Sequence, residues 1–355
     1  MSNETNEELV PQEEIKIGKV GGEALMEGIM MRGPKGAAVS LRLSDGSIET
    51  SLKQIKTPAE RCKIFGWPLI RGPVNLVYSM AFGYKCMMES AEKVTESIME
   101  DAEPEEMGKL DRWIEAHFGP KMMKAVGVIG IVLGLGIAMF MFAFLPSLIY
   151  DGIVRLAGDI GFRALIEGVV RVSLFVGYMS LMSLMKDIRR VFQYHGAEHK
   201  AIYCYEAGLP LTVENVKMQS RLHPRCGTSF LFVVILLSIL VSAILSLLIP
   251  GLWASPNLFI RFPMRILMMP LLMAFGYEFI RFAGKHLNNP IVRALSFPGM
   301  SMQRITTKEP DEKVIEVGIT ALKAALGLPY EEPQDDDPPS DSEGANAPGP
   351  SETQE

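Results

Sequence analysis

Four long apolar stretches constrain this chain more than any other feature. They are residues 122–150, 162–185, 228–249 and 262–282. Each is long enough to cross about 30 Å of hydrocarbon as an α-helix, and such stretches are the main sequence signal for a membrane span. A helix satisfies its own backbone hydrogen bonds inside a bilayer. The sequence therefore predicts a mostly α-helical, polytopic membrane protein with about four spans, forming a membrane domain over residues 122–286.

Basic residues predict the orientation of these spans. The loop at residues 186–227 holds seven Lys and Arg, whereas the two loops on the other side hold only Arg155 and Arg261. Because loops rich in Lys and Arg stay on the cytoplasmic side, this loop and both termini are expected to face the cytoplasm of the bacterial inner membrane. The four cysteines are then expected to be thiols or metal ligands rather than disulfides.

The remaining segments differ in character. Residues 1–14 and 329–355 are acidic and are expected to be disordered tails. Residues 15–60 predict a small cytoplasmic β unit, because residues 38–43 and 47–52 alternate on either side of an Asp45-Gly46 turn. A further strand and a glycine-bent loop are expected within residues 21–34.

Amphipathic helices are expected on both sides of the membrane domain, at residues 61–121 and 287–328. For the apolar stretch 65–91 we expect a helix at the membrane interface or packed on the spans, with a fifth re-entrant or spanning segment as the alternative. Without the acidic tails the body of the chain is basic. We expect this basic body to bind the lipid bilayer, with anionic lipid and other membrane proteins as further partners. No specific nucleic acid is expected.

The cytoplasmic loop contains His195, Glu198 and His199 in the order His-x-x-Glu-His. On a helix the two histidines stack one turn apart, and Glu198 lies near both. The apolar periodicity of residues 188–206 places both histidines on the buried face and turns Lys200 away from it. Since imidazole is the commonest zinc ligand, and a carboxylate beside zinc can act as a base, the motif predicts two ligands and the catalytic base Glu198. Its order is similar to that of the inverzincin metallopeptidases.

Further ligands are available downstream. His223 and Cys226 follow at a ligand-like spacing. Glu278, near the cytoplasmic end of the fourth span, is the preferred distant carboxylate. The competitors for that place are Glu206, Glu214 and His286. The alternative without metal is a set of buried histidines that bond to backbone or carboxylate groups.

One charged pair falls inside a predicted span. Glu167 and Arg171 are four residues apart in apolar surroundings, so we expect them to pair and to face the interior of the bundle. The first interpretation is an ion pair with a structural role. A transporter is the alternative if Glu167, Arg171 and Glu278 line a polar cavity.

Three motifs together resemble the YqhQ-like family of uncharacterised bacterial membrane proteins, over about residues 17–328. They are Gly21-Gly22-Glu23-Ala24-Leu25-Met26-Glu27-Gly28, Tyr194-His195-Gly196-Ala197-Glu198-His199-Lys200 and His223-Pro224-Arg225-Cys226-Gly227-Thr228-Ser229-Phe230. The resemblance implies a metal-dependent enzyme in which His195, Glu198, His199, His223 and Cys226 are the positions of interest. Inverzincins are soluble α/β proteins, so the shared motif does not by itself transfer their peptidase activity.

The sequence thus favours a zinc-dependent membrane hydrolase, acting on a peptide or a lipid-linked ester at the cytoplasmic face. The second hypothesis is a non-catalytic accessory of membrane-protein biogenesis or translocation, with a structural metal or a hydrogen-bonded histidine site. A transporter is the third.

Overall fold

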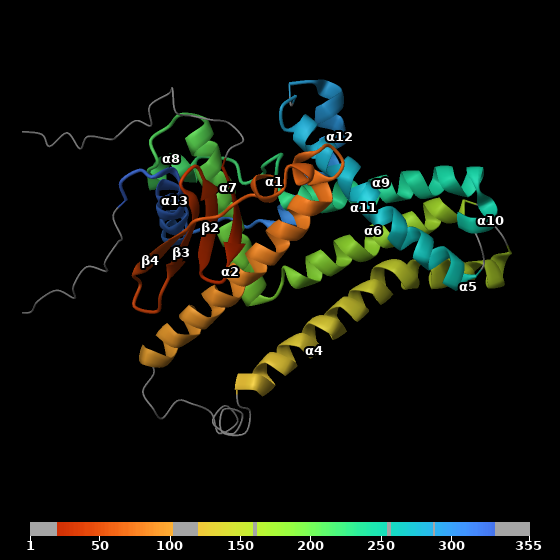
Figure 1. The fold of residues 1–355 in the computed structure, drawn as a ribbon, viewed down its shortest axis with the longest axis horizontal. Coiled ribbons are helices and arrows are strands. Elements are labelled where there is room, and N and C mark those ends of the chain that lie inside the picture. The colour runs from red at the N-terminus through yellow and green to blue at the C-terminus, as the bar shows by residue number, and fades with distance from the viewer. Residues whose placement is uncertain (1–19, 102–119, 159–161, 254–256, 287, 331–355) are drawn as a thin grey trace, which may run out of the picture.

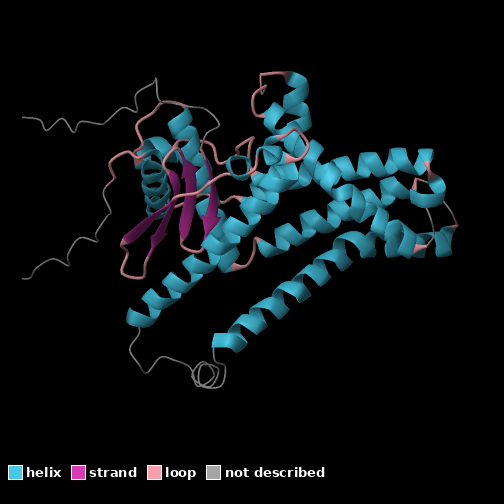
Figure 2. Ribbon diagram, viewed as in Figure 1, coloured by secondary structure: helices cyan, strands magenta, loops and turns pink. Residues whose placement is uncertain are grey.

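The structure is a computed structural model that describes residues 20–101, 120–158, 162–253, 257–286 and 288–330. The N-terminal acidic tail and nearly all of the C-terminal one lie outside the described residues. The chain is mostly helical and carries one small antiparallel sheet near its N-terminus (Figure 2). This arrangement confirms the prediction of a mostly helical chain with a small β unit near its N-terminus.

The sheet is a four-stranded antiparallel meander in the order β1-β2-β3-β4. Its strands are β1 (Gly21–Leu25), β2 (Gly28–Gly33), β3 (Gly36–Arg42) and β4 (Ile48–Lys53). The predicted turn joins β3 and β4: Gly46 has a φ of 87°, and the Asp45 carboxylate accepts a hydrogen bond of 2.9 Å from the backbone N–H of Ser47. Such residues favour this turn because they tolerate its backbone conformation.

Helices cover both faces of the sheet (Figure 1). The short α1 (Pro58–Arg61) and η2 (Lys63–Gly66) lead into α2 (Arg71–Asp101), which covers one face, and α13 (Glu312–Leu326) and α7 (Lys186–Glu206) cover the other. The side chains of β2 alternate between the two faces of the sheet. Met30 packs toward α2, whereas Ile29 and Met31 pack toward α7 and α13. Residues from the two ends of the chain therefore build one folded unit.

The hairpin between β1 and β2 fixes helix α7 in place. At its turn Glu27 accepts a hydrogen bond of 2.9 Å from the Tyr194 hydroxyl and bonds of 3.1 Å from the Arg190 guanidinium. Glu27 has a positive φ of 45°, an uncommon conformation outside glycine. A buried tyrosine and an ion pair thus hold the hairpin against the helix that carries the motif.

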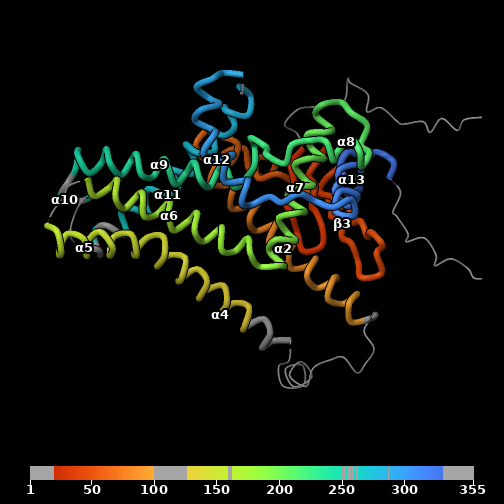
Figure 3. The backbone as a smooth tube through the Cα atoms, turned by 180° about the vertical axis from the view of Figure 1, so that it is seen from behind, coloured from red at the N-terminus to blue at the C-terminus, as the bar shows by residue number. Residues whose placement is uncertain are grey.

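Four helices of the described chain are long and apolar enough to span a membrane, as predicted. The first candidate span, Val126–Ala157, joins α4 (Pro120–Met139), η3 (Phe140–Phe144) and α5 (Leu145–Ala157), and it runs beyond the predicted end at residue 150. The others lie on α6 (Arg163–Met182), α9 (Gly227–Leu248) and α11 (Leu258–Ala283). Figure 3 shows α6, α9 and α11 running side by side away from the sheet.

Short helices complete the connections between these elements. They are α8 (Val213–Lys217), α10 (Pro250–Trp253) and α12 (Pro290–Thr306). Helix α12 packs along α9 and contacts α6 and α11. Helix α2, which contains most of the apolar stretch 65–91, contacts α11 at its start and the sheet further along. Among the described helices, α2 is not one of the four that could span a membrane.

Charged side chains between the candidate spans find partners, but the predicted ion pair between Glu167 and Arg171 is wrong. Glu167 is 2% exposed and accepts hydrogen bonds from Arg163 and Arg265. Arg171 donates to the Phe142 carbonyl at 3.0 Å and to a serine hydroxyl. Ionic groups inside a bilayer are costly unless they find partners. These contacts between helices supply such partners, so helix packing is enough to explain the charged residues.

Candidate metal centre

Helix α7 carries the motif and is buried along most of its C-terminal half. His195 and His199 lie one turn apart, with ring centroids separated by 4.5 Å. Their neighbour Glu198 is 4% exposed. The expectation that Lys200 turns away from the core is wrong. This residue is 3% exposed, because its ammonium group donates to a backbone carbonyl and pairs with Glu309.

The loop before α9 brings a second pair of side chains to the same place. Gln303 of α12 clamps this loop, accepting a hydrogen bond of 2.6 Å from the His223 N–H and donating one of 2.7 Å to the His223 carbonyl. Cys226 is then the N-cap residue of α9. Because α9 is a candidate membrane span, the Cys226 thiol lies at the boundary between the span and the sheet unit.

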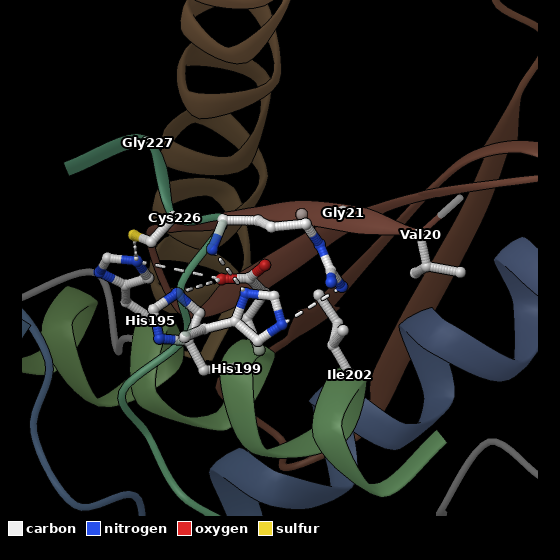
Figure 4. Close-up of a pocket in the computed structure, with 11 residues that line it drawn as sticks. Val20, Gly21, His195, His199, Ile202, Cys226 and Gly227 are labelled. Atoms are coloured by element: carbon white, nitrogen blue, oxygen red, sulfur yellow. Dashed lines mark hydrogen bonds and ion pairs between the residues drawn. The ribbon is translucent and has the colours of Figure 1, made fainter. Parts of the chain in front are cut away.

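Three of these side chains converge on one point (Figure 4). One ligand atom each from His195, His199 and Cys226 lies within 4.8 Å of the other two. The Nε2 atom of His195 lies 3.2 Å from the sulfur of Cys226. All three residues are largely shielded from solvent.

Backbone carbonyls fix how the two imidazoles are protonated. The Nδ1 atom of His195 lies 2.9 Å from the Thr306 carbonyl, and that of His199 lies 2.5 Å from the Arg221 carbonyl. A carbonyl oxygen only accepts, so each Nδ1 carries a proton, and the nitrogen that would give up its proton to a metal ion is Nε2. Metal-binding histidines commonly use one nitrogen in this way and leave the other for the ion.

The geometry and chemistry of the cluster fit a zinc ion. A tetrahedral zinc ion with its usual nitrogen and sulfur bonds separates its ligand atoms by roughly 3.3–3.8 Å. The separations here, between 3.2 Å and 4.8 Å, come within small side-chain rotations of that arrangement. Two imidazoles and one thiolate are a donor set that suits zinc. Three protein ligands leave the fourth position open.

A cavity of about 110 Å³ lies against the cluster and has room for several water molecules. The Glu198 carboxylate lines it, 3.5 Å from the Nε2 of His199 and 4.0 Å from the Nε2 of His195. Arg225 lines it too, and its guanidinium also pairs with Glu206. A base and a cationic hydrogen-bond donor therefore face the open side of the cluster.

The surroundings of the cluster perturb its ionisation. Burial raises the pKa of Cys226, but the imidazoles of His195 and His199 outweigh burial and hold that pKa well below its usual range. Burial lowers the pKa of His195, yet the Cys226 sulfur and the Glu198 carboxylate bring the pKa up to about 9. The sulfur is thus favoured as a thiolate, the form that binds metal ions.

Comparison with known proteins places the chain in a family. Residues 67–328 match the family described as "Protein of unknown function (DUF1385)". The chain is also 33% identical to "Uncharacterized protein YqhQ" of Bacillus subtilis (strain 168) over 308 residues, which cover 87% of this chain and 92% of that protein. The chain belongs to the YqhQ-like family. No solved structure matches it.

The family match confirms the resemblance that was inferred from the three sequence motifs. Neither description names a reaction, a substrate or a metal. For this YqhQ-like chain, the chemistry of the site therefore rests on the geometry of its own side chains.

The five expected ligands do not all meet in the structure. His223 lines the same cavity, with its ring 5.5 Å from that of His199, but its Nε2 faces Arg225 at 3.4 Å and Glu206 at 3.9 Å. Burial lowers the pKa of His223. It stands beside the three-ligand cluster rather than within it.

Glu278 is not brought to the cluster. Its two carboxylate oxygens accept hydrogen bonds of 2.7 and 2.6 Å from Arg71 at the start of α2. The preference for Glu278 as a distant ligand therefore needs correction. A strong bidentate pair satisfies this carboxylate and joins α2 to α11. Of its competitors, Glu214 and His286 are exposed and do not line the cavity.

Several residues of the site escaped the sequence reasoning. Gly22 of β1 lines the cavity, and a Cβ atom there would lie 2.8 Å from the Cγ of Glu198. Gln303 and Thr306 support the loop and His195 from α12. The Gly21-Gly22 pair was visible as a motif, but only the packing of β1 against α7 shows that Gly22 makes room for Glu198.

Proposed function

We propose that this protein is a zinc-dependent hydrolase of the inner membrane, which cleaves a peptide or a lipid-linked ester at the cytoplasmic face. One observation carries the proposal: His195, His199 and Cys226 present three ligand atoms to one point, beside a cavity that Glu198 lines. Three ligands with an open position are typical of catalytic rather than structural zinc.

The residues around the cavity have separate tasks in this proposal. A zinc ion held by the three ligands supplies a Lewis acid that activates water and polarises a carbonyl group. Glu198 takes a proton from the attacking water and returns it to the leaving group. Arg225 offers a guanidinium to the oxygen on which negative charge develops. The site adjoins the start of span α9, which suits a substrate held at the membrane surface.

A cobalt experiment tests the metal centre directly. Cobalt(II) that replaces zinc in the purified full-length protein should give an intense thiolate-to-cobalt absorption band in the near ultraviolet, because one of its ligands is sulfur. The band should vanish in Cys226→Ser and persist in Cys204→Ser, whose thiol is buried but bonds to backbone carbonyls elsewhere. Cobalt binding with no such band in the unmutated protein would exclude Cys226 as a ligand.

One contact favours a second chemistry without metal. The 3.2 Å approach of His195 to Cys226 also fits a thiol nucleophile activated by an imidazole. In that case iodoacetamide should inactivate the metal-free protein, and a chelator should leave its activity unchanged. The convergence of His199 on the same sulfur, and of Glu198 on both imidazoles, favours the metal.

A non-catalytic role is the remaining alternative. His223 lies at the edge of the same cavity, and a rotation of its ring toward His199 would close the site with a fourth ligand. A closed site holds a fold together without chemistry. Such a protein would serve membrane-protein biogenesis or translocation as an accessory, and its metal would fasten the loop between α7 and α9.

We infer that both termini and the metal centre face the cytoplasm, as the basic-residue asymmetry predicts. Two exposed positions outside the candidate spans make the test: Met218, 75% exposed in the loop after α8, and Gly251 of α10, where an added Cβ atom would meet nothing within 4 Å. In a Cys62→Ser background, a membrane-impermeant maleimide should label Gly251→Cys in intact cells. It should reach Met218→Cys only after the membrane is opened. The reverse pattern would overturn this orientation.

A further inference from the structure

Strand β1 is an edge of the sheet, and it borders the metal centre. The strand order leaves one side of β1 without a partner strand. Gly21 and Gly22 of this strand line the same cavity as His195, His199 and Cys226. Figure 4 shows the strand passing over the motif helix, with Gly21 beside the cavity. An edge strand offers a row of unpaired N–H and C=O groups to another chain.

The register shows which groups point outward. Only two residues separate Leu25 from its partner Gly28, so this pair closes the hairpin with hydrogen bonds. In an antiparallel ladder, hydrogen-bonded and non-hydrogen-bonded pairs alternate. The pairs of Gly22 with Met31 and of Ala24 with Ile29 are therefore the non-bonded ones. The backbone N–H and C=O groups of Gly22 and Ala24 face away from β2.

Among the residues that the structure describes, none is seen to hydrogen-bond these outward groups. At Gly22 the missing side chain lets Glu198 lie directly under the strand. Gly22, which carries the first of these outward groups, and the Glu198 carboxylate thus line the same cavity, and Ala24 continues the free edge beyond it.

We propose that the free edge of β1 binds the substrate as an extended stretch of polypeptide, added to the sheet as a further strand. The inference rests on the proposed hydrolase and chooses a peptide over a lipid-linked ester, because an ester has no row of amides to pair with the strand. The peptide would lie across the cavity, with one carbonyl carbon above the cluster.

The reaction at that carbon is an ordinary hydrolysis. The water oxygen forms a bond to the carbonyl carbon, and the carbon–nitrogen bond of the same peptide unit breaks. One proton of the water passes through Glu198 to the leaving nitrogen. The second proton of the water stays with the new carboxyl group, so the products are a carboxylic acid and an amine, and no oxidant or reductant takes part.

Two hydroxamic acids test the proposal on the full-length, zinc-loaded protein. Acetohydroxamic acid can only chelate the metal, whereas N-acetyl-trialanine hydroxamic acid can also pair with β1. We expect the peptide compound to bind at least tenfold more tightly, which corresponds to about 1.4 kcal/mol. N-methylation of its amides should weaken binding at alternate positions only, because amides of a strand point alternately toward and away from the neighbouring strand.

A matched pair of variants locates the effect on β1. Ala24→Pro removes an outward N–H from this edge, and Leu52→Pro does the same on β4 at the opposite edge, where Leu52 is likewise a non-bonded position. Proline is tolerated at such edge positions. The first variant should weaken the peptide compound about three- to tenfold and leave acetohydroxamic acid unchanged. The second should change neither.

The binding results distinguish a failure of the strand proposal from a failure of the proposed metal centre. Equal affinity for the two compounds, or an equal loss for every N-methylation, would overturn the strand proposal and leave the metal centre intact. Failure of both compounds to bind the zinc-loaded protein would overturn the open metal site, and the strand proposal with it.

Discussion

Alanine at position 199 should remove nearly all bound zinc from the purified protein. Structural zinc sites bind with about 10–16 kcal/mol, so one of three or four protein ligands contributes roughly 3–5 kcal/mol, or a more than hundredfold change in affinity. The Nδ1 atom of His199 bonds to a backbone carbonyl, so its Nε2 is the nitrogen offered to the metal ion. Its loss leaves only His195 and Cys226. Elemental analysis of the full chain, with a competing chelator to measure affinity, gives the result.

Two other histidines serve as controls for that experiment. His286 is exposed and bonds to the Phe282 carbonyl, so His286→Ala should keep its full complement of zinc. His223→Ala separates the open site from the closed one, because His223 lines the cavity but stands outside the three-ligand cluster. The open site keeps its zinc in this variant, whereas the closed site loses most of it. Stoichiometric zinc in a His195→Ala, His199→Ala double variant would show that the site is elsewhere.

The spans and the sheet could be predicted because each depends on local pattern. Apolar length alone identified the spans, and alternation around Asp45-Gly46 identified a hairpin. The full extent of the first span was missed, since a π-helical segment at Phe140–Phe144 and the following α5 continue it past residue 150. The union of the N-terminal sheet with α13 was also beyond reach, because contacts between the two ends of a chain leave no local signal.

The site was partly predictable for a similar reason. His195 and His199 follow from helical spacing, whereas Cys226 joins them only because Gln303 clamps its loop. Glu278 looked equally suitable in the sequence, yet Arg71, about two hundred residues earlier, holds it. The position of a charged group along a predicted span could not reveal which partner it finds.

Lys200 shows how periodicity fails where a helix is buried all round. A single apolar stripe predicts one buried face. Helix α7 instead lies between the sheet, α13 and the loop before α9, so that residues on every side of it from 196 to 202 are covered. Long polar side chains are tolerated there because their ends find partners, as the Lys200 ammonium does at Glu309.

The second large effect is expected from Glu198→Gln, which keeps the shape of the side chain and removes its basicity. The carboxylate lies 3.5 Å from the Nε2 atom of His199 and 4.0 Å from that of His195, but it is outside the set of three ligand atoms. Zinc content and thermal unfolding should therefore stay nearly unchanged. Cleavage of a peptide library, followed by mass spectrometry, should fall about a hundredfold or more, because proton transfer by a positioned base contributes that much.

The matched control for this variant is Glu214→Gln, an exposed carboxylate of α8 outside the cavity, which should cleave like the unmutated protein. An accessory with a structural metal predicts a different pattern. There Glu198 would only support the ligands, so its replacement would lower zinc affinity and stability together, by about 10- to 100-fold in affinity. A zinc-replete Glu198→Gln protein with full activity would end the hydrolase proposal, since no other carboxylate lines the cavity among the described residues.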